Sequence, residues 1–144
     1  MGKTRKGKGT KCMVLVDGQG VPLGMHLSAA TPAESSLALQ TLDSRVTARQ
    51  PDRIIADRGY DARHLWEAMK ERGVDLIAPH IRTRTNRFQD GRKLRRYRRR
   101  WIVERTHAWL FNFRRLVVRY ERKLENFRAF LHLACVLIAL RKIA

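Results

Sequence analysis

The segment that decides the fold is residues 53–61, which reads RIIADRGYD. It opens with a short apolar run typical of a buried strand and continues into turn residues. A helical pattern then begins at Asp61, its expected N-cap, and stops at Gly73, and residues 74–78 form a second apolar run. The order strand, helix, strand predicts parallel pairing. Asp57 should therefore lie at the carboxyl edge of a sheet, where functional groups of α/β proteins gather.

Outward from this segment, residues 11–17 and 22–29 are apolar runs separated by a turn sequence, and this pattern predicts a hairpin. After the second parallel strand, residues 80–90 form a basic loop. Helical spacing of apolar residues recurs in three further segments, residues 31–46, 92–116 and 124–141. The expected order is ββαβαβαα, which defines an α/β fold with helices packed on the sheet and a helical C-terminal third.

The charge of the chain indicates a polyanionic partner. Its 144 residues suit one domain, and a hydrophobic content of 44% is enough for a buried core. The 31 Lys and Arg outnumber the 13 Asp and Glu, giving a net charge of +18. A field of this sign attracts nucleic acid first and acidic membranes second. Residues 82–128 hold 17 Lys and Arg and four acids, so the basic surface should lie mainly in the second half.

The N-terminal segment, the longest apolar run and the two cysteines indicate a protein without a membrane span, a disulfide framework or a zinc site. Residues 1–11 are rich in Lys, Arg and Gly and are interpreted as a flexible basic arm, with the folded domain over residues 12–144. The longest apolar run, residues 129–140, is too short to cross a bilayer, so no membrane partner is expected. Cys12 and Cys135 have neither disulfide nor zinc-site spacing, which favours a reducing, cytoplasmic location.

Two carboxylates are candidates for chemistry. Asp57 follows a strand directly, although turn aspartates often only cap the turn. Glu104 lies among arginines, and its alternative interpretation is an ion pair with Arg100, one helical turn earlier. Carboxylates from different elements that meet at a sheet edge can hold Mg²⁺ for phosphodiester chemistry. Two ions usually require at least three carboxylates, and the sequence offers two good ones.

The residues around Glu104 leave two further alternatives open. Trp101 and Trp109 could stack on nucleic-acid bases, but their spacing along one helix face favours a place in the core. His107, one turn past Glu104, could assist a metal site or face a phosphate, and the second is the preferred interpretation.

Two blocks of sequence resemble the DDE transposases of bacterial insertion sequences. The first is residues 55–61, which reads IADRGYD. In the second, Tyr97, Arg100 and Glu104 match the signature Y-x2-R-x3-E. The likeness extends over nearly the whole chain from about Lys8. It implies a ribonuclease-H-like fold and cleavage and strand transfer of DNA with Mg²⁺ or Mn²⁺. It also implies that Asp57 and Glu104 are catalytic metal ligands, the second and third acids of the family's triad.

The resemblance also implies where DNA binds. The expected partners are the DNA of the element ends and of the target. A lysine of the family signature falls on Phe111 here, so its contact would pass to another residue, such as Arg114. The residues expected to contact the DNA backbone are Tyr97, Arg98, Arg99, Arg100, Arg105 and Arg114.

One departure from the family concerns its first acid, which lies on a strand upstream of the block that resembles residues 8–17. No such strand is found in this sequence. Asp17 also ends an apolar run, but the residues after it have turn composition, which places it at a hairpin tip. We therefore expect the C-terminal part of a transposase. Its fold should be a ribonuclease-H-like mixed sheet that lacks its first strand, and it should be incomplete as a catalyst.

The missing strand should leave two unpaired strand edges in the sheet. A homo-oligomer or an upstream fragment of the same transposase is the expected protein partner. The competing hypothesis is a non-catalytic basic protein that binds nucleic acid by charge alone.

Overall fold

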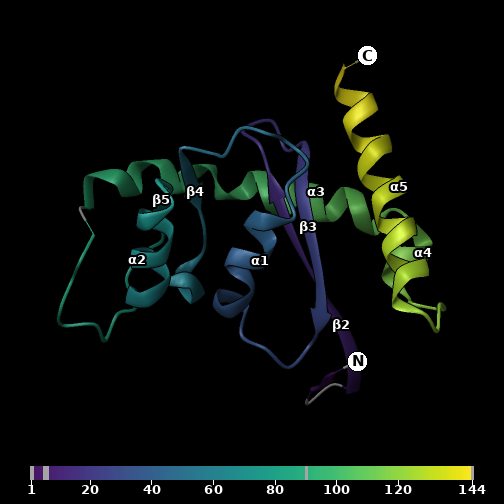
Figure 1. Ribbon diagram of the computed structural model, residues 1–144, viewed down its shortest axis with the longest axis horizontal. Coiled ribbons are helices and arrows are strands. Elements are labelled where there is room, and N and C mark those ends of the chain that lie inside the picture. Colours follow the sequence, from purple (N-terminus) through teal and green to yellow (C-terminus); the bar gives the residue numbers. More distant parts are fainter. Residues whose placement is uncertain (1, 5–6, 90, 144) are drawn as a thin grey trace.

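The computed structural model describes residues 2–4, 7–89 and 91–143 (Figure 1). The strands are β1 (Gly2–Thr4), β2 (Gly7–Val16), β3 (Pro22–Ala29), β4 (Arg53–Ile55) and β5 (Asp75–Ile77). The short helices are η1 (Glu34–Leu37), α1 (Ala38–Asp43), η2 (Arg58–Tyr60) and α4 (Arg114–Val117). The longer helices are α2 (Arg63–Glu71), η3 (Gly91–Arg100), α3 (Trp101–Phe111) and α5 (Leu124–Ile143). The α/β class is therefore confirmed.

The strands form two separate sheets. In the first, β2 pairs antiparallel with both β1 and β3, and in the second, β4 pairs parallel with β5. The hairpin and the parallel pair predicted from the sequence are both confirmed. At the hairpin tip, the Asp17 carboxylate accepts hydrogen bonds from the backbone N–H of Gln19 at 2.8 Å and Val21 at 2.9 Å. Asp17 is thus a turn-capping residue, as its sequence context predicts.

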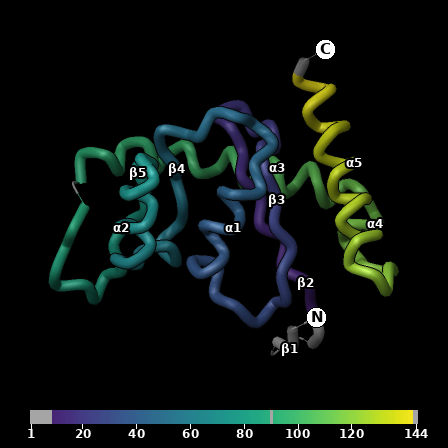
Figure 2. The backbone as a smooth tube through the Cα atoms, viewed as in Figure 1, coloured from purple at the N-terminus to yellow at the C-terminus, as the bar shows by residue number. Residues whose placement is uncertain are grey.

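Each sheet packs against its own helices. One hydrophobic core joins β3 to the helices of the C-terminal third, through Leu27, Leu110, Leu116, Phe127, Leu131, Ala134, Cys135 and Ile138. The other joins α1, α2 and β5, through Ala38, Leu42, Leu65, Met69, Val74 and Leu76. The consecutive helices η3 and α3 run along one side and link the two cores (Figure 2), because η3 contacts β4 and β5 while α3 contacts β2 and α5. No helix in the described part of the chain is long and apolar enough to span a bilayer.

The hairpin turn and α3 are locked together by a close approach. The Thr106 side chain is fully buried, and its hydroxyl donates a hydrogen bond of 2.8 Å to the carbonyl of Gly20. Gly20 has a φ of +89°, and a Cβ at this position would lie 2.9 Å from Thr106 Oγ1. Only glycine satisfies both the left-handed backbone and the space available. This contact fixes the position of α3 against the first sheet.

Several predicted boundaries need correction. The helix expected over residues 31–46 is confined to η1 and α1, residues 34–43. Asp61 is not the N-cap of α2, because Ala62 occupies that position without a side-chain bond and the Asp61 carboxylate binds elsewhere. Residues 92–116 are divided among η3, α3 and α4. The half-buried residues of η3 recur every third residue, which is the period of a 3₁₀ helix. They are Leu94, Tyr97 and Arg100.

The N-terminal segment differs from the flexible arm expected over residues 1–11. Gly2–Thr4 pairs with residues 7–9, so strand structure extends into this segment. Residues 1, 5 and 6 of the expected arm lie outside the described residues. The division into an arm and a domain beginning at residue 12 stays a prediction.

Candidate active site and nucleic-acid interface

A cleft of about 670 Å³ lies between the two sheets. Its wall includes residues 12–18 of β2 and the turn after it, and residues 53–57 of β4 and the turn after it. On the remaining side it is bordered by η3 and α3. Several charged and polar residues that the sequence singled out line this cleft, although 47 positions separate Asp57 from Glu104. Those that line the cleft are Asp17, Asp57, Arg99, Arg100, Glu104 and His107.

Asp57 lies where β4 ends and caps the short helix η2. Its Oδ1 accepts a hydrogen bond of 2.8 Å from the backbone N–H of Gly59. A Cβ on Gly59 would lie 3.0 Å from this oxygen, so a glycine permits the cap. The capping interpretation of Asp57 is therefore confirmed for one oxygen. Because a carboxylate has two oxygens, the cap leaves Oδ2 available as a ligand, and it has no hydrogen-bond partner among the described residues.

Glu104 lies on the first turn of α3 and is more than half exposed. Its Oε1 is 2.5 Å from Nη1 of Arg100, in the ion pair that the spacing of four residues predicts. The Arg100 guanidinium also lies over the ring of Tyr97, 5.6 Å from its centroid. The three signature residues thus form a continuous chain of contacts at the rim of the cleft.

His107 faces the same cleft one helical turn beyond Glu104. Burial lowers the pKa of His107 because it disfavours the charged imidazolium, and the negative charge of Glu34 offsets this only in part. The imidazole is therefore neutral at neutral pH. A neutral imidazole can bind a metal ion through one nitrogen or donate a hydrogen bond to a phosphate through the other. Both roles considered from the sequence, assisting a metal site and facing a phosphate, are therefore compatible with its position.

The oxygen donors in the cleft fit two of the ligand positions of a hard divalent cation. Asp57 and Glu104 come from different elements, and carboxylate oxygens are the protein ligands that Mg²⁺ and Mn²⁺ prefer. Within residues 2–4, 7–89 and 91–143, no group of three or more His, Cys, Asp or Glu residues is placed to hold a metal ion. A metal ion bound by Asp57 and Glu104 would need further ligands.

Most of the arginines expected to bind DNA present their side chains to solvent. Arg98, Arg99 and Arg114 are exposed, while Tyr97 and Arg100 are half-buried. Arg98 and Arg99 lie on η3, and Arg114 lies at the start of α4. The basic surface borders the cleft along the side where Arg99 and Arg100 lie.

Arg105 is more constrained than the other arginines. Its guanidinium lies between the rings of Trp101 and Trp109, 4.7 Å from each centroid, and donates a hydrogen bond of 2.7 Å to the carbonyl of Gln19. The prediction that both tryptophans are core is wrong for Trp101, which is 52% exposed. The neighbouring Ile102 occupies the inward position on α3, and Trp101 covers Arg105 instead.

Asp61 has a structural role that the sequence did not indicate. Its buried carboxylate accepts hydrogen bonds from the N–H of Ile81 at 2.6 Å and Nε of Arg84 at 2.8 Å, and lies 2.9 Å from Nδ1 of His80. Burial alone would raise the pKa of Asp61, but the bonds from Ile81, His80 and Arg84 together lower it below its usual value. No local pattern reveals this cluster, because the partners are 19 to 23 residues away.

An α/β protein whose cleft is lined by carboxylates and several arginines has the features of a protein that handles polyanionic substrates. Residues 1–139 match the family described as the transposase DDE domain, and the chain belongs to this family. The resemblance seen in the sequence is therefore confirmed. Members of this family generally use a divalent metal ion.

The chain is also similar to a transposase of the insertion sequence element IS402 from Burkholderia cepacia. The two are 36% identical over 138 residues, an alignment that covers 90% of this chain and 62% of that relative. The chain thus spans less than two thirds of the relative's length. No solved structure matches the chain.

Proposed function

We propose that this chain acts in DNA transposition by an insertion sequence. In this proposal it binds the DNA of the element ends and target and takes part in metal-dependent strand cleavage and strand transfer. The supporting observation is that Asp57 and Glu104, from different elements, line one cleft with arginines beside them. A protein that bound DNA by charge alone would have no use for carboxylates among its phosphate-binding groups.

Asp57 and Glu104 are the proposed ligands of Mg²⁺ or Mn²⁺. A bound ion of this kind supplies Lewis-acid activation of the phosphodiester and of the attacking oxygen. Asp57 is held in place by its bond to Gly59 and presents its second oxygen. Glu104 becomes available to a metal ion when its ion pair with Arg100 breaks. Breaking the pair costs little, because a helical ion pair of this spacing at the surface is worth only about 0.3–0.5 kcal/mol.

The released Arg100 and its neighbours bind the DNA backbone. Arg98, Arg99 and Arg114 are exposed and contact phosphates directly. Tyr97 orients the Arg100 guanidinium through its ring, and Arg105 adds positive charge from between the two tryptophans. These contacts position the strand without reading its sequence.

A ribonuclease-H-like sheet would need a further strand between β2 and β4. Among the described residues, residues 10–16 of β2 pair only with β3, and β4 pairs only with β5, so each has an edge without a strand partner there. Both strands line the cleft with apolar side chains, among them Leu15 and Ile54. We propose that an extended segment pairs there and brings the third carboxylate. An upstream fragment of the same transposase or a second copy of the chain would supply it.

Nicking of a supercoiled plasmid with Mg²⁺ or Mn²⁺ tests the catalytic proposal. The proteins compared are this chain, a version extended upstream, and both of these with Glu104→Gln. Glu71→Gln is the matched control, because Glu71 is an exposed glutamate on α2 outside the cleft.

We expect the extended protein and its Glu71→Gln variant to nick the plasmid and Glu104→Gln to abolish nicking. Binding of the plasmid without nicking by any version would contradict catalysis and favour the non-catalytic DNA-binding alternative. Nicking that survives Glu104→Gln would show that the carboxylates are assigned wrongly.

A further inference from the structure

The loop over residues 79–89, which connects β5 to η3, is fixed to the turn that carries Asp57. Asp61 follows that turn, and its carboxylate binds His80, Ile81 and Arg84 of the loop. Because β4 and β5 are parallel, the turn after β4 and the loop after β5 leave the sheet at the same edge (Figure 1). The loop therefore lies at the edge of the sheet where Asp57 lies.

The loop is held at several points although it contains no helix or strand. The Phe88 ring lies edge-on to the His80 ring, with centroids 4.8 Å apart, and the Arg84 guanidinium lies 4.9 Å from the Phe88 centroid. Arg84 Nη2 also donates a hydrogen bond of 2.8 Å to the carbonyl of Asp61. At the loop's end, the Gln89 side chain accepts a bond from the backbone N–H of Ala78. These contacts give the loop a defined shape.

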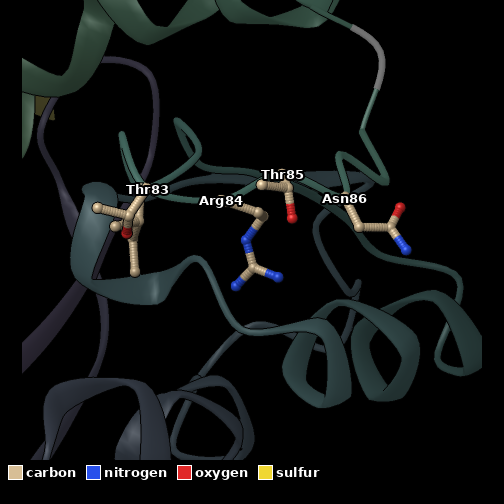
Figure 3. Close-up of a pocket in the computed structure, with 5 residues that line it drawn as sticks. Thr83, Arg84, Thr85 and Asn86 are labelled. Atoms are coloured by element: carbon tan, nitrogen blue, oxygen red, sulfur yellow. The ribbon is translucent and has the colours of Figure 1, made fainter.

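The exposed side of the loop carries groups that bind phosphate. Asp61 offsets the charge of Arg84, but Arg82 and Arg87 are exposed and form no ion pair with the described residues. Hydroxyl and amide groups lie between them. A hollow of about 260 Å³ is lined by Ile81, Thr83, Arg84, Thr85 and Asn86. Figure 3 shows the side chains of residues 83–86 side by side along the loop. No acidic residue occurs within residues 79–89.

We propose that this loop is a second DNA-binding surface, which holds the phosphate backbone of the strand beyond the reacting phosphate at Asp57. Arg82 and Arg87 provide the charge, and Thr83, Thr85 and Asn86 donate hydrogen bonds to phosphate oxygens. Asp61 is the positioning residue, since it binds the loop from the turn that presents Asp57. This inference rests on the proposed function, because the partner is DNA.

The test measures binding of a fluorescein-labelled DNA duplex by anisotropy over a series of salt concentrations. The main variant is Arg82→Ala with Arg87→Ala. The matched control is Arg128→Ala with Arg141→Ala, which removes the same charge from exposed positions on α5, at the other end of the molecule (Figure 1). Log K falls as log salt rises, and each lost phosphate contact makes this negative slope shallower by about 0.9. We therefore expect the magnitude of the slope to decrease by about 2 in the loop variant and to stay unchanged in the control.

Asp61→Asn tests the positioning role separately. We expect the same loss of slope, faster tryptic cleavage after Arg82 and Arg87, and no further loss when the substitution is combined with the loop variant. Equal binding by the loop variant and the control would overturn the inference and leave the proposed function standing. Absence of DNA binding by the unsubstituted protein would overturn both.

Discussion

Nη1 of Arg100 lies 2.5 Å from Oε1 of Glu104, one helical turn away, at the rim of the cleft that Asp57 also lines. In the proposed function, the pair places a phosphate-binding group and a metal-binding group in contact, and each is paired with the other until its own ligand binds. Because the pair is exposed and weak, it can be exchanged at little cost.

Removal of Arg100 should therefore strengthen metal binding and weaken DNA binding. Arg100→Ala leaves Glu104 without its competing cation, and we expect Mn²⁺ affinity, measured by electron paramagnetic resonance, to rise a few-fold. The unfolding free energy should change by less than about 0.5 kcal/mol. Arg128→Ala, which removes an exposed arginine outside the cleft, should leave Mn²⁺ affinity unchanged. Unaltered Mn²⁺ affinity in Arg100→Ala would argue that Glu104 is not a ligand.

The contact between Gly20 and Thr106 should be sensitive to a single methyl group. Gly20→Ala places a Cβ 2.9 Å from Thr106 Oγ1 on a backbone with positive φ, so we expect a loss of about 1–3 kcal/mol in urea unfolding. Gly18→Ala is the control, because a Cβ there meets no atom within 4 Å and Gly18 lies in the same turn. Equal stability of the two variants would show that this close approach does not hold α3 in place.

The stability that Asp61 provides should depend on pH. Its folded-state pKa is lowered, so its contribution is complete above the unfolded pKa of about 3.9 and is lost as the pH falls through the folded value. Asp61→Asn should cost about 1–3 kcal/mol at pH 7. The difference from the unsubstituted protein should shrink as the pH falls below about 3.9, and it should vanish only below the lowered folded pKa, where a protonated Asp61 resembles asparagine. A difference that is constant with pH would contradict the ionised cluster.

The two cysteines should be unreactive in the folded protein. Burial raises the pKa of Cys12 to about 12, with a further contribution from Cys135, and burial raises the pKa of Cys135 to about 11. Because the thiolate is the reactive form, we expect iodoacetamide at pH 8 to modify neither residue until urea unfolds the protein. Rapid labelling of either thiol without urea would show that the C-terminal core opens readily.

The parts of this fold that follow from local sequence were predictable. The hairpin, β4, β5 and the position of Asp57 depend on short apolar runs and adjacent turn residues. The spacing of four residues likewise predicted the Arg100–Glu104 pair. The placing of Asp57 and Glu104 along one cleft needed the family resemblance, because no local rule relates the end of β4 to α3.

Features that depend on tertiary contacts were missed. Asp61 has the composition of a helix cap, but a loop about 20 residues later supplies better hydrogen-bond donors. Trp101 fits a core pattern, but Ile102 takes the buried position and Arg105 provides a stacking partner for the exposed ring. At Asp61 a contact distant in sequence outweighs the local preference, whereas at Trp101 the orientation of α3 gives the buried position to the neighbouring residue.

The central claim is that Asp57 and Glu104 bind the same metal ion. Fe²⁺ in place of Mg²⁺, with ascorbate and peroxide, cleaves a polypeptide backbone next to the bound ion, and the cut sites can be mapped by mass spectrometry. With DNA present, we expect cuts near both residue 57 and residue 104, and loss of both cuts in either Asp57→Asn or Glu104→Gln. Cuts near only one of the two residues, or cuts that persist at one when the other is replaced, would contradict a shared site.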